Sequence, residues 1–196
     1  MQIEDFKNRH PGARACVIGK GPSLDTIDEL RDYLERSVVF TCNEAVHKIE
    51  LLDLRAPVYA VQQDSALGRK CVPLQAVHFM NCYQLVRANR KQKLRRVAKS
   101  EWNPLAVLYD PCSFGQSHTA FTAIMAAALA RYMGCTELVF LCFDSWAPHG
   151  ATHYARCVGG PPDEGLRHAV DGKAIRAEVK RMGFESVTAR HPKVEV

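Results

Sequence analysis

Short apolar runs alternate with segments of helical periodicity along most of the chain. The runs are rich in β-branched and aromatic residues and end at glycine or polar residues, which is typical of strands. They lie at residues 15–18, 38–42, 58–61, 76–80, 105–108, 137–143 and 186–189. The run at 137–143 is almost entirely apolar, which indicates a strand buried on both faces.

Apolar residues recur every three or four positions between residues 24 and 34, which predicts an amphipathic helix. The strongest helix is predicted at residues 117–133, where an Ala-rich segment ends at Gly134. Residues 84–100 are polar and basic, and we expect them to be helical if ordered. Further helices are predicted at residues 1–12, 45–52 and 171–183.

Strands that alternate with helices form parallel sheets with crossover connections. We therefore expect an α/β protein with a Rossmann-like open, mostly parallel sheet, helices on both faces and a small lid. A chain of 196 residues suits one nucleotide-binding domain over residues 1–196. The lid is expected in the Gly/Pro/His-rich segment 147–168.

Composition narrows the class of protein. No apolar run reaches the roughly 18–20 residues that span a bilayer, so we expect no membrane partner. The N-terminus lacks an apolar signal segment, which favours a cytoplasmic protein. The eight cysteines include no C-x-x-C pair, and burial as reduced thiols is the leading interpretation. A homo-oligomer is compatible with these features.

The net charge of +5 is unevenly distributed. Seven cations gather between residues 87 and 99, namely Arg87, Arg90, Lys91, Lys93, Arg95, Arg96 and Lys99. Such a segment could follow a nucleic-acid backbone, or it could be a solvated helix face. Both interpretations stay open on the sequence alone.

In an open parallel sheet, ligands bind outside the carboxyl ends of the strands. The turn after the first predicted strand is rich in glycine and could hold a phosphate on its backbone N–H groups. It consists of Gly19, Lys20, Gly21, Pro22 and Ser23. It is neither a Walker A loop nor a complete G-x-G-x-x-G motif. A plain strand-to-helix turn is the alternative.

Polar residues also follow other predicted strands. Asn43 could contact a base edge or a ribose hydroxyl, or could cap the next helix. Gln62 and Asp144 close two further strands and complete the expected pocket.

A hydroxyl-rich segment opens the strongest helix, with Gln116, Ser117 and His118 at its start. The positive end of a helix dipole suits an anion, and Ser117 could equally act as the cap.

Histidines concentrate late in the chain. His149, His153 and Cys157 recur every four residues, so a zinc site is conceivable, although nearby proline and glycine weigh against helical geometry. His168 precedes the final helix and could be a general base or an ordinary surface histidine.

Taken together, the GxGPSL turn, Asn43, the Ala-rich helix and the strand ending at Asp144 resemble the family-42 glycosyltransferases. These are bacterial sialyltransferases that use CMP-activated sugars, and related phage and bacterial proteins share the pattern. The resemblance implies nucleotide binding by Gly19, Gly21, Pro22, Ser23 and Asn43. It places Gln116, Ser117 and His118 in the donor pocket and His168 as the base, without a metal. Lys20 departs from the asparagine usual in that turn.

Two alternatives remain. The GxGPSL turn also resembles the archaeal 6-hydroxymethylpterin diphosphokinases, which implies Mg-dependent transfer from ATP, with Asp64 and Asp144 as the available carboxylates. The third possibility is a non-catalytic protein that binds a nucleotide or nucleic acid. The expected function is transfer from a nucleotide donor, such as a CMP-sugar, to a hydroxyl acceptor.

Overall fold

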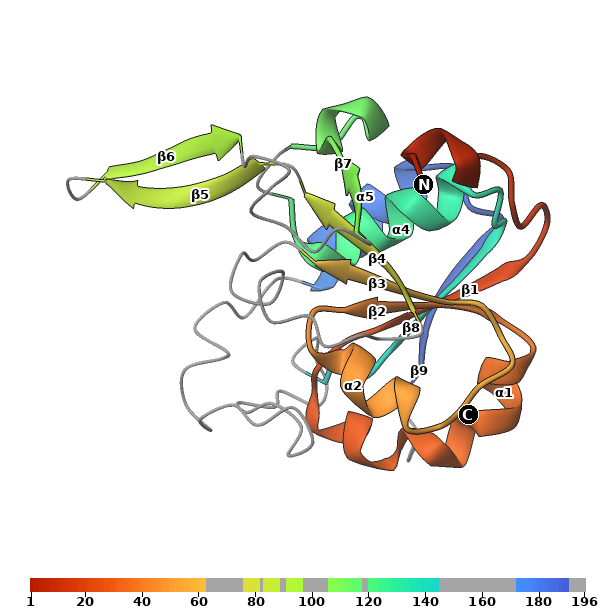
Figure 1. Ribbon diagram of the computed structural model, residues 1–196. Coiled ribbons are helices and arrows are strands. Elements are labelled where there is room, and N and C mark those ends of the chain that lie inside the picture. Colours follow the sequence, from red (N-terminus) through yellow and green to blue (C-terminus); the bar gives the residue numbers. More distant parts are fainter. Residues whose placement is uncertain are drawn as a thin grey trace.

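Seven parallel strands form the main sheet in the order β7-β4-β3-β2-β1-β8-β9 (Figure 1). The computed structural model describes residues 1–62, 76–81, 83–88, 91–96, 106–117, 120–144 and 172–190. The strands are β1 (Arg14–Ile18), β2 (Val38–Cys42), β3 (Val58–Gln62), β4 (Val77–Asn81), β7 (Val107–Tyr109), β8 (Glu137–Leu141) and β9 (Ser186–Arg190). Every pairing within this sheet is parallel, which confirms the predicted open α/β sheet.

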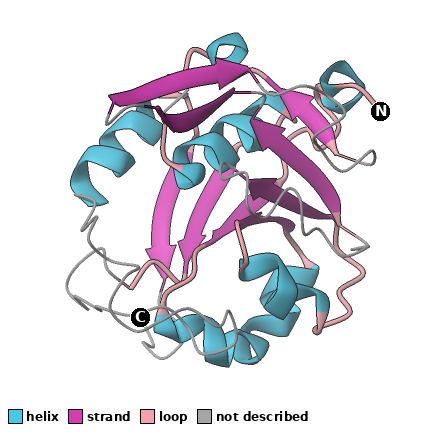
Figure 2. Ribbon diagram, turned by 60° about the vertical axis from the view of Figure 1, so that its left-hand side comes forward, coloured by secondary structure: helices cyan, strands magenta, loops and turns pink. Residues whose placement is uncertain are grey.

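Helices cover both faces of the sheet, as predicted (Figure 2). On one face lie η1 (Ile3–Phe6), α4 (Thr122–Tyr132) and α5 (Gly172–Arg181). On the other lie η2 (Pro22–Leu30), α1 (Arg31–Glu35) and α2 (Ala45–Glu50). Alternate residues of β2 serve the two layers, since Phe40 packs in the first core and Val39 in the second.

The predicted helix over residues 24–34 is instead a 3₁₀ helix, η2, followed by the short α1. The backbone kinks at Thr26, whose φ and ψ are −114° and 17°. The Thr26 hydroxyl donates to the Ser23 carbonyl over 3.2 Å, and such local side-chain bonds compete with regular helix bonding.

The remaining helix and strand boundaries shift by a few residues. Helix α4 begins at Thr122 rather than at residue 117, because Phe121 is extended with φ −60° and ψ 146°. The leading helix shrinks to η1, and β8 ends at Leu141, two residues early. The expected lid at residues 147–168 lies outside the described residues.

The expectation of a helix at residues 84–100 is wrong for the described residues 84–88 and 91–96, and the other residues of that range lie outside the described ones. Residues Tyr83–Ala88 form β5 and residues Lys91–Arg96 form β6, which pair antiparallel. Tyr83 and Val86 have high strand propensity, and Leu85 lies directly opposite Leu94 in the backbone ladder. This two-stranded ribbon extends away from the main sheet (Figure 1).

Candidate functional site

The strand order reverses between β1 and β8. From β1 the sheet grows outward through β2, β3, β4 and β7, and the chain then returns to place β8 on the other side of β1. Ligands of open α/β sheets bind in the crevice outside the carboxyl ends of two such strands. The segments that leave β1 and β8 here are the Gly-rich turn and the residues leading to Asp144.

These two segments are bound to each other. The Ser23 backbone N–H and the Ser23 hydroxyl both donate to Asp144 Oδ2, over 2.9 and 2.8 Å. The Gly21 N–H donates to the Cys142 carbonyl over 2.8 Å. Asp144 is only 3% exposed. The Ser23 N–H, which a phosphate would use, is therefore engaged by the protein's own carboxylate.

Close approach explains both glycines of the turn. A Cβ on Gly21 would lie 2.1 Å from Asp144 Oδ2 and 2.8 Å from the Cys142 carbonyl oxygen. A Cβ on Gly19 would lie 2.6 Å from the same carbonyl oxygen. Any larger residue at either position would push the turn away from the end of β8.

The charge of Lys20 is balanced within the protein. Its Nζ lies 2.5 Å from Glu44 Oε2, and the two side chains are 16% and 26% exposed. The pair ties the turn after β1 to the start of α2.

Asn43 follows β2 in a left-handed conformation, with φ 52°. Asparagine tolerates this backbone better than most residues. Its Nδ2 donates to Thr122 Oγ1 over 3.4 Å. The contact brings the first turn of α4 to the carboxyl end of β2, next to the Gly-rich turn.

Gln62 ends β3 and is buried at the same edge. The structure adds Asn81, a buried amide at the end of the neighbouring β4 that is not among the residues predicted from the sequence. The signal was present, because Asn81 is a polar residue that closes an apolar strand. Asn43, Gln62 and Asn81 thus place three amide side chains along adjacent strand ends.

Gln116 and Ser117 lie near the edge of the sheet, on the side away from the Gly-rich turn. They follow η4 (Pro111–Phe114) after the edge strand β7, which is four strand spacings, about 19 Å, from β1. Ser117 accepts a bond from the Ala120 N–H over 2.9 Å, and the chain then runs to Thr122 beside Asn43.

Several candidate residues lie outside the described residues: Asp64, His118, His149, His153, Cys157 and His168. Within the described ranges, no three His, Cys, Asp or Glu side chains gather as a metal site would require. Within the same ranges, no helix has the length and apolar character needed to cross a membrane.

Cys42 sits beside Asn43 at the end of β2. Burial raises the pKa of this thiol to about 12, which the nearby Lys20 only partly offsets. The thiol therefore stays protonated near neutral pH and acts as a core residue rather than a nucleophile.

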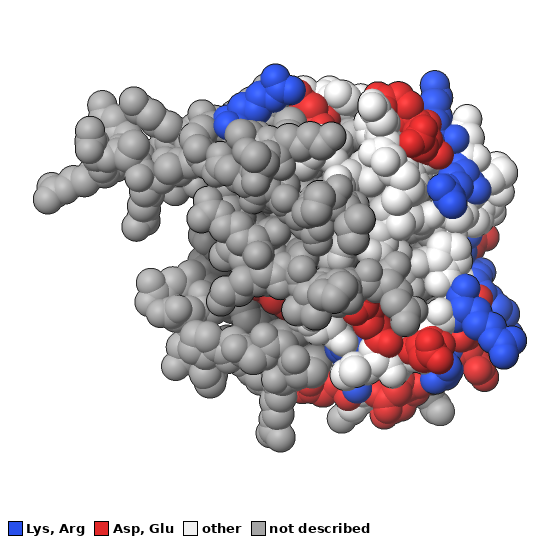
Figure 3. All heavy atoms as spheres, viewed as in Figure 1, with Lys and Arg blue, Asp and Glu red and all other residues white. Residues whose placement is uncertain are grey.

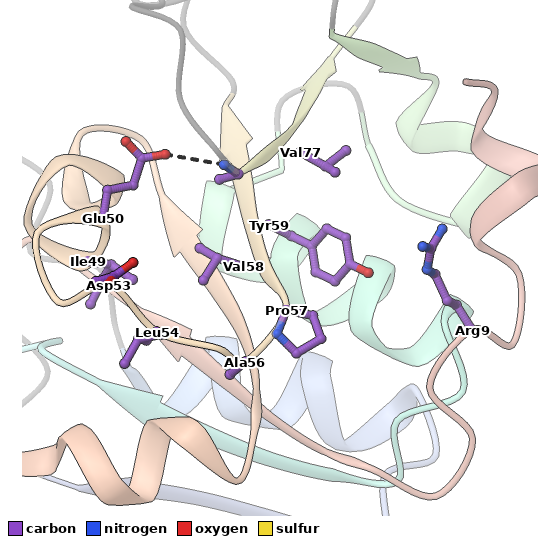
Figure 4. Close-up of a pocket in the computed structure, with 11 residues that line it drawn as sticks. Arg9, Ile49, Glu50, Asp53, Leu54, Ala56, Pro57, Val58, Tyr59 and Val77 are labelled. Atoms are coloured by element: carbon purple, nitrogen blue, oxygen red, sulfur yellow. Dashed lines mark hydrogen bonds between the residues drawn. The ribbon is translucent and has the colours of Figure 1, made fainter.

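A cavity of about 290 Å³ opens at the opposite, amino-terminal edge of the sheet (Figure 4). The starts of β3 and β4 form its floor, Glu50 and Asp53 lie on one side, and Arg9 lies on the other. Glu50 accepts a bond from the Ala76 N–H over 3.2 Å. Tyr59 lines the cavity, and its hydroxyl lies 2.7 Å from His10 Nε2.

No protein-family model matches the chain, and no curated protein does either. The structure of the MAf glycosyltransferase from Magnetospirillum magneticum AMB-1 is similar, with a TM-score of 0.52 at 12% sequence identity. The match covers 99% of this chain and 38% of that protein. The chain has a glycosyltransferase-like fold. At this identity the likeness concerns the fold, and it does not extend to family 42 or to sialyltransferases.

Proposed function

We propose that the chain is a glycosyltransferase-like protein that transfers a group from a nucleotide-sugar donor to a hydroxyl acceptor. One observation carries the proposal: the strand order reverses between β1 and β8, and the Gly-rich turn and Asp144 meet there. The likeness of the whole chain to a glycosyltransferase fold supports the same function.

The donor would lie along the carboxyl ends of β1 to β4. The amides of Asn43, Gln62 and Asn81 can both donate and accept, which suits a base edge and ribose hydroxyls. We expect the donor's phosphate to avoid the Ser23 N–H, because Asp144 holds it. A carboxylate at that position favours hydroxyl groups of the sugar or ribose as its neighbours.

The transfer step would use His168 as its base. The acceptor oxygen would attack the anomeric carbon while the bond from that carbon to the phosphate oxygen breaks. The acceptor proton would pass to the imidazole, and the nucleotide would leave with the bonding electrons.

Calorimetric titration with CMP, UDP and GDP tests the binding step. We expect at least one nucleotide to bind, and we expect Asn43→Asp and Gln62→Glu each to weaken it by about tenfold, the effect of losing one good hydrogen bond. Both substitutions keep the side-chain size, and aspartate tolerates the backbone of position 43. Arg36→Gln, exposed at the other edge of the sheet, is the matched control. Equal affinities in all four proteins would place the nucleotide elsewhere.

Turnover of the sugar conjugate of the bound nucleotide tests the chemistry. His168→Ala should abolish release of the nucleotide while leaving its affinity unchanged, and surviving turnover would remove His168 from the step. An activity that requires ATP and Mg²⁺ and is lost in Asp64→Asn would instead favour the diphosphokinase-like alternative.

A further inference from the structure

The backbone pairing of β5 and β6 places three cations, Lys91, Lys93 and Arg95, on one face of the ribbon and two, Arg87 and Arg96, on the other. Directly opposed residues of an antiparallel pair share a face, and successive residues alternate between faces. Gln84 pairs with Arg95, Val86 with Lys93 and Ala88 with Lys91. The backbone register therefore puts Lys91, Lys93 and Arg95 in one row on one face.

The row is regular and carries one sign of charge. Alternate residues of a strand are about 6.8 Å apart, which equals two base-pair steps of a nucleic-acid duplex. Residues 83–96 contain six Lys or Arg residues and no Asp or Glu. No carboxylate of the ribbon itself therefore balances the row.

The ribbon is also separate from the body of the protein. Its two strands pack chiefly on each other and extend beyond the main sheet (Figure 1). On the described body, by contrast, acidic and basic residues are interspersed (Figure 3). The row of Lys91, Lys93 and Arg95 thus belongs to an element that extends beyond the main sheet.

We propose that this ribbon binds the phosphate backbone of double-stranded nucleic acid, independently of the transfer function. A two-stranded ribbon fits the major groove, and phosphate contacts by Lys and Arg supply affinity that does not depend on sequence. Single-strand binders stack bases on several aromatic side chains, whereas Tyr83 is the only aromatic residue between 83 and 96. The duplex is therefore the occupant that the row fits.

Fluorescence anisotropy with a labelled DNA duplex of about two helical turns tests the proposal across a range of salt concentrations. The test variant is K91Q/K93Q/R95Q. The matched control is K7Q/R36Q/K180Q, which removes three exposed cations of the body and leaves the same net charge. Each neutralised phosphate contributes about 0.9 to the slope of log K against log salt, so the test variant should lose about 2.7 of that slope. The control should keep the wild-type slope.

Equal slopes in the two variants would overturn the assignment to this row, and no duplex binding by the wild type would overturn the proposal. So would tighter binding to the single strand of the same sequence or to phosphatidylserine vesicles. Circular dichroism checks that the variants fold. The charge-preserving K91R/K93R/R95K variant should retain binding, and its failure to bind while folded would contradict a backbone-charge mechanism.

Discussion

The two ends of the strands in the main sheet differ in how tightly the chain packs there. At the carboxyl edge, the turn after β1 and the segment after β8 approach so closely that Gly19 and Gly21 have no room for a Cβ. At the amino edge, the starts of β3 and β4 leave a cavity of about 290 Å³, close to the lower limit of small-molecule pockets. The edge with the recognisable sequence motif is the closed one, and the open one has no motif.

This difference shows what can be inferred from a Gly-rich turn. Its glycines show that something comes close to the backbone, and here that neighbour is another segment of the same chain. Ser23 and Asp144 together form a preorganised corner of the crevice rather than a vacant anion site. Recognition of a donor would then fall to the amides along β2, β3 and β4.

The largest expected effect comes from filling the closed edge. Gly21→Ala should lower the free energy of unfolding by about 3 kcal/mol, the upper part of the range for overpacking, because both a side chain and a backbone oxygen oppose the new methyl. Urea denaturation measures it. Because the methyl and Asp144 would collide, Gly21→Ala and Asp144→Ala should be strongly non-additive.

The control for that coupling is Gly12→Ala, at a left-handed position where a Cβ would meet nothing within 4 Å. Its cost is backbone strain alone, so it should add to Asp144→Ala without coupling. Similar coupling energies for the two glycines would show that the edge is less closed than the structure has it.

Removing the carboxylate should have the next largest effect. Asp144→Ala leaves the Ser23 N–H and hydroxyl without their acceptor, and we expect a loss of about 2 kcal/mol in urea denaturation. Ser23→Ala removes only the hydroxyl bond and should cost about half as much. If the variants are equally stable, the turn is held by its backbone bonds, such as Gly21 N–H to Cys142, instead of by Asp144.

Low pH should destabilise the protein through two histidines near the amino edge of the sheet. Burial lowers the pKa of His10, assisted by Arg9, and burial lowers the pKa of His78, assisted by His47. A depressed histidine pKa means that the unfolded chain binds protons more readily, so stability should fall as pH drops through the unfolded value near 6.5. Urea denaturation at pH 8 and at pH 5.5 measures this loss.

His10→Asn and His78→Asn should each reduce that pH dependence, and the double variant should reduce it most. Tyr59→Phe distinguishes the contribution of His10 from that of His78, because it removes only the hydroxyl partner of His10. It should lower the free energy of unfolding by about 1 kcal/mol. An unchanged pH dependence in the double variant would mean that other groups cause the acid sensitivity.

Local patterns predicted the strands well because each is a short apolar run with its own boundaries. They also located the strand-end residues Asn43, Gln62 and Asp144. The bond between Ser23 and Asp144 spans 121 positions, so no local pattern could show that the turn is occupied. The cavity joins Arg9 to the starts of two distant strands and was invisible for the same reason.

The prediction for the ribbon of β5 and β6 was wrong for a different reason. The polar and basic composition of residues 84–100 suits an exposed helix, and composition alone therefore predicts the wrong element there. The alternation that places Lys91, Lys93 and Arg95 on one face has a period of two, and that period was the better guide. The start of α4 differs from the prediction because Phe121 has an extended backbone, so the helix begins only at Thr122, where the Ala-rich part of the segment starts.

The smallest expected effect compares two ion pairs, one at each edge. Lys20 and Glu44 lie 2.5 Å apart at the carboxyl edge, with side chains 16% and 26% exposed. Arg14 and Glu137, at the starts of β1 and β8, lie 2.9 Å apart but are 35% and 42% exposed. Surface pairs contribute about 0.2–1 kcal/mol, and burial reduces screening.

Double-mutant cycles with Lys20→Met/Glu44→Gln and Arg14→Met/Glu137→Gln should therefore give the larger coupling for the Lys20 pair. Raising the salt concentration should weaken the Arg14 pair more, and the reverse order would show that the carboxyl edge is the more solvated of the two.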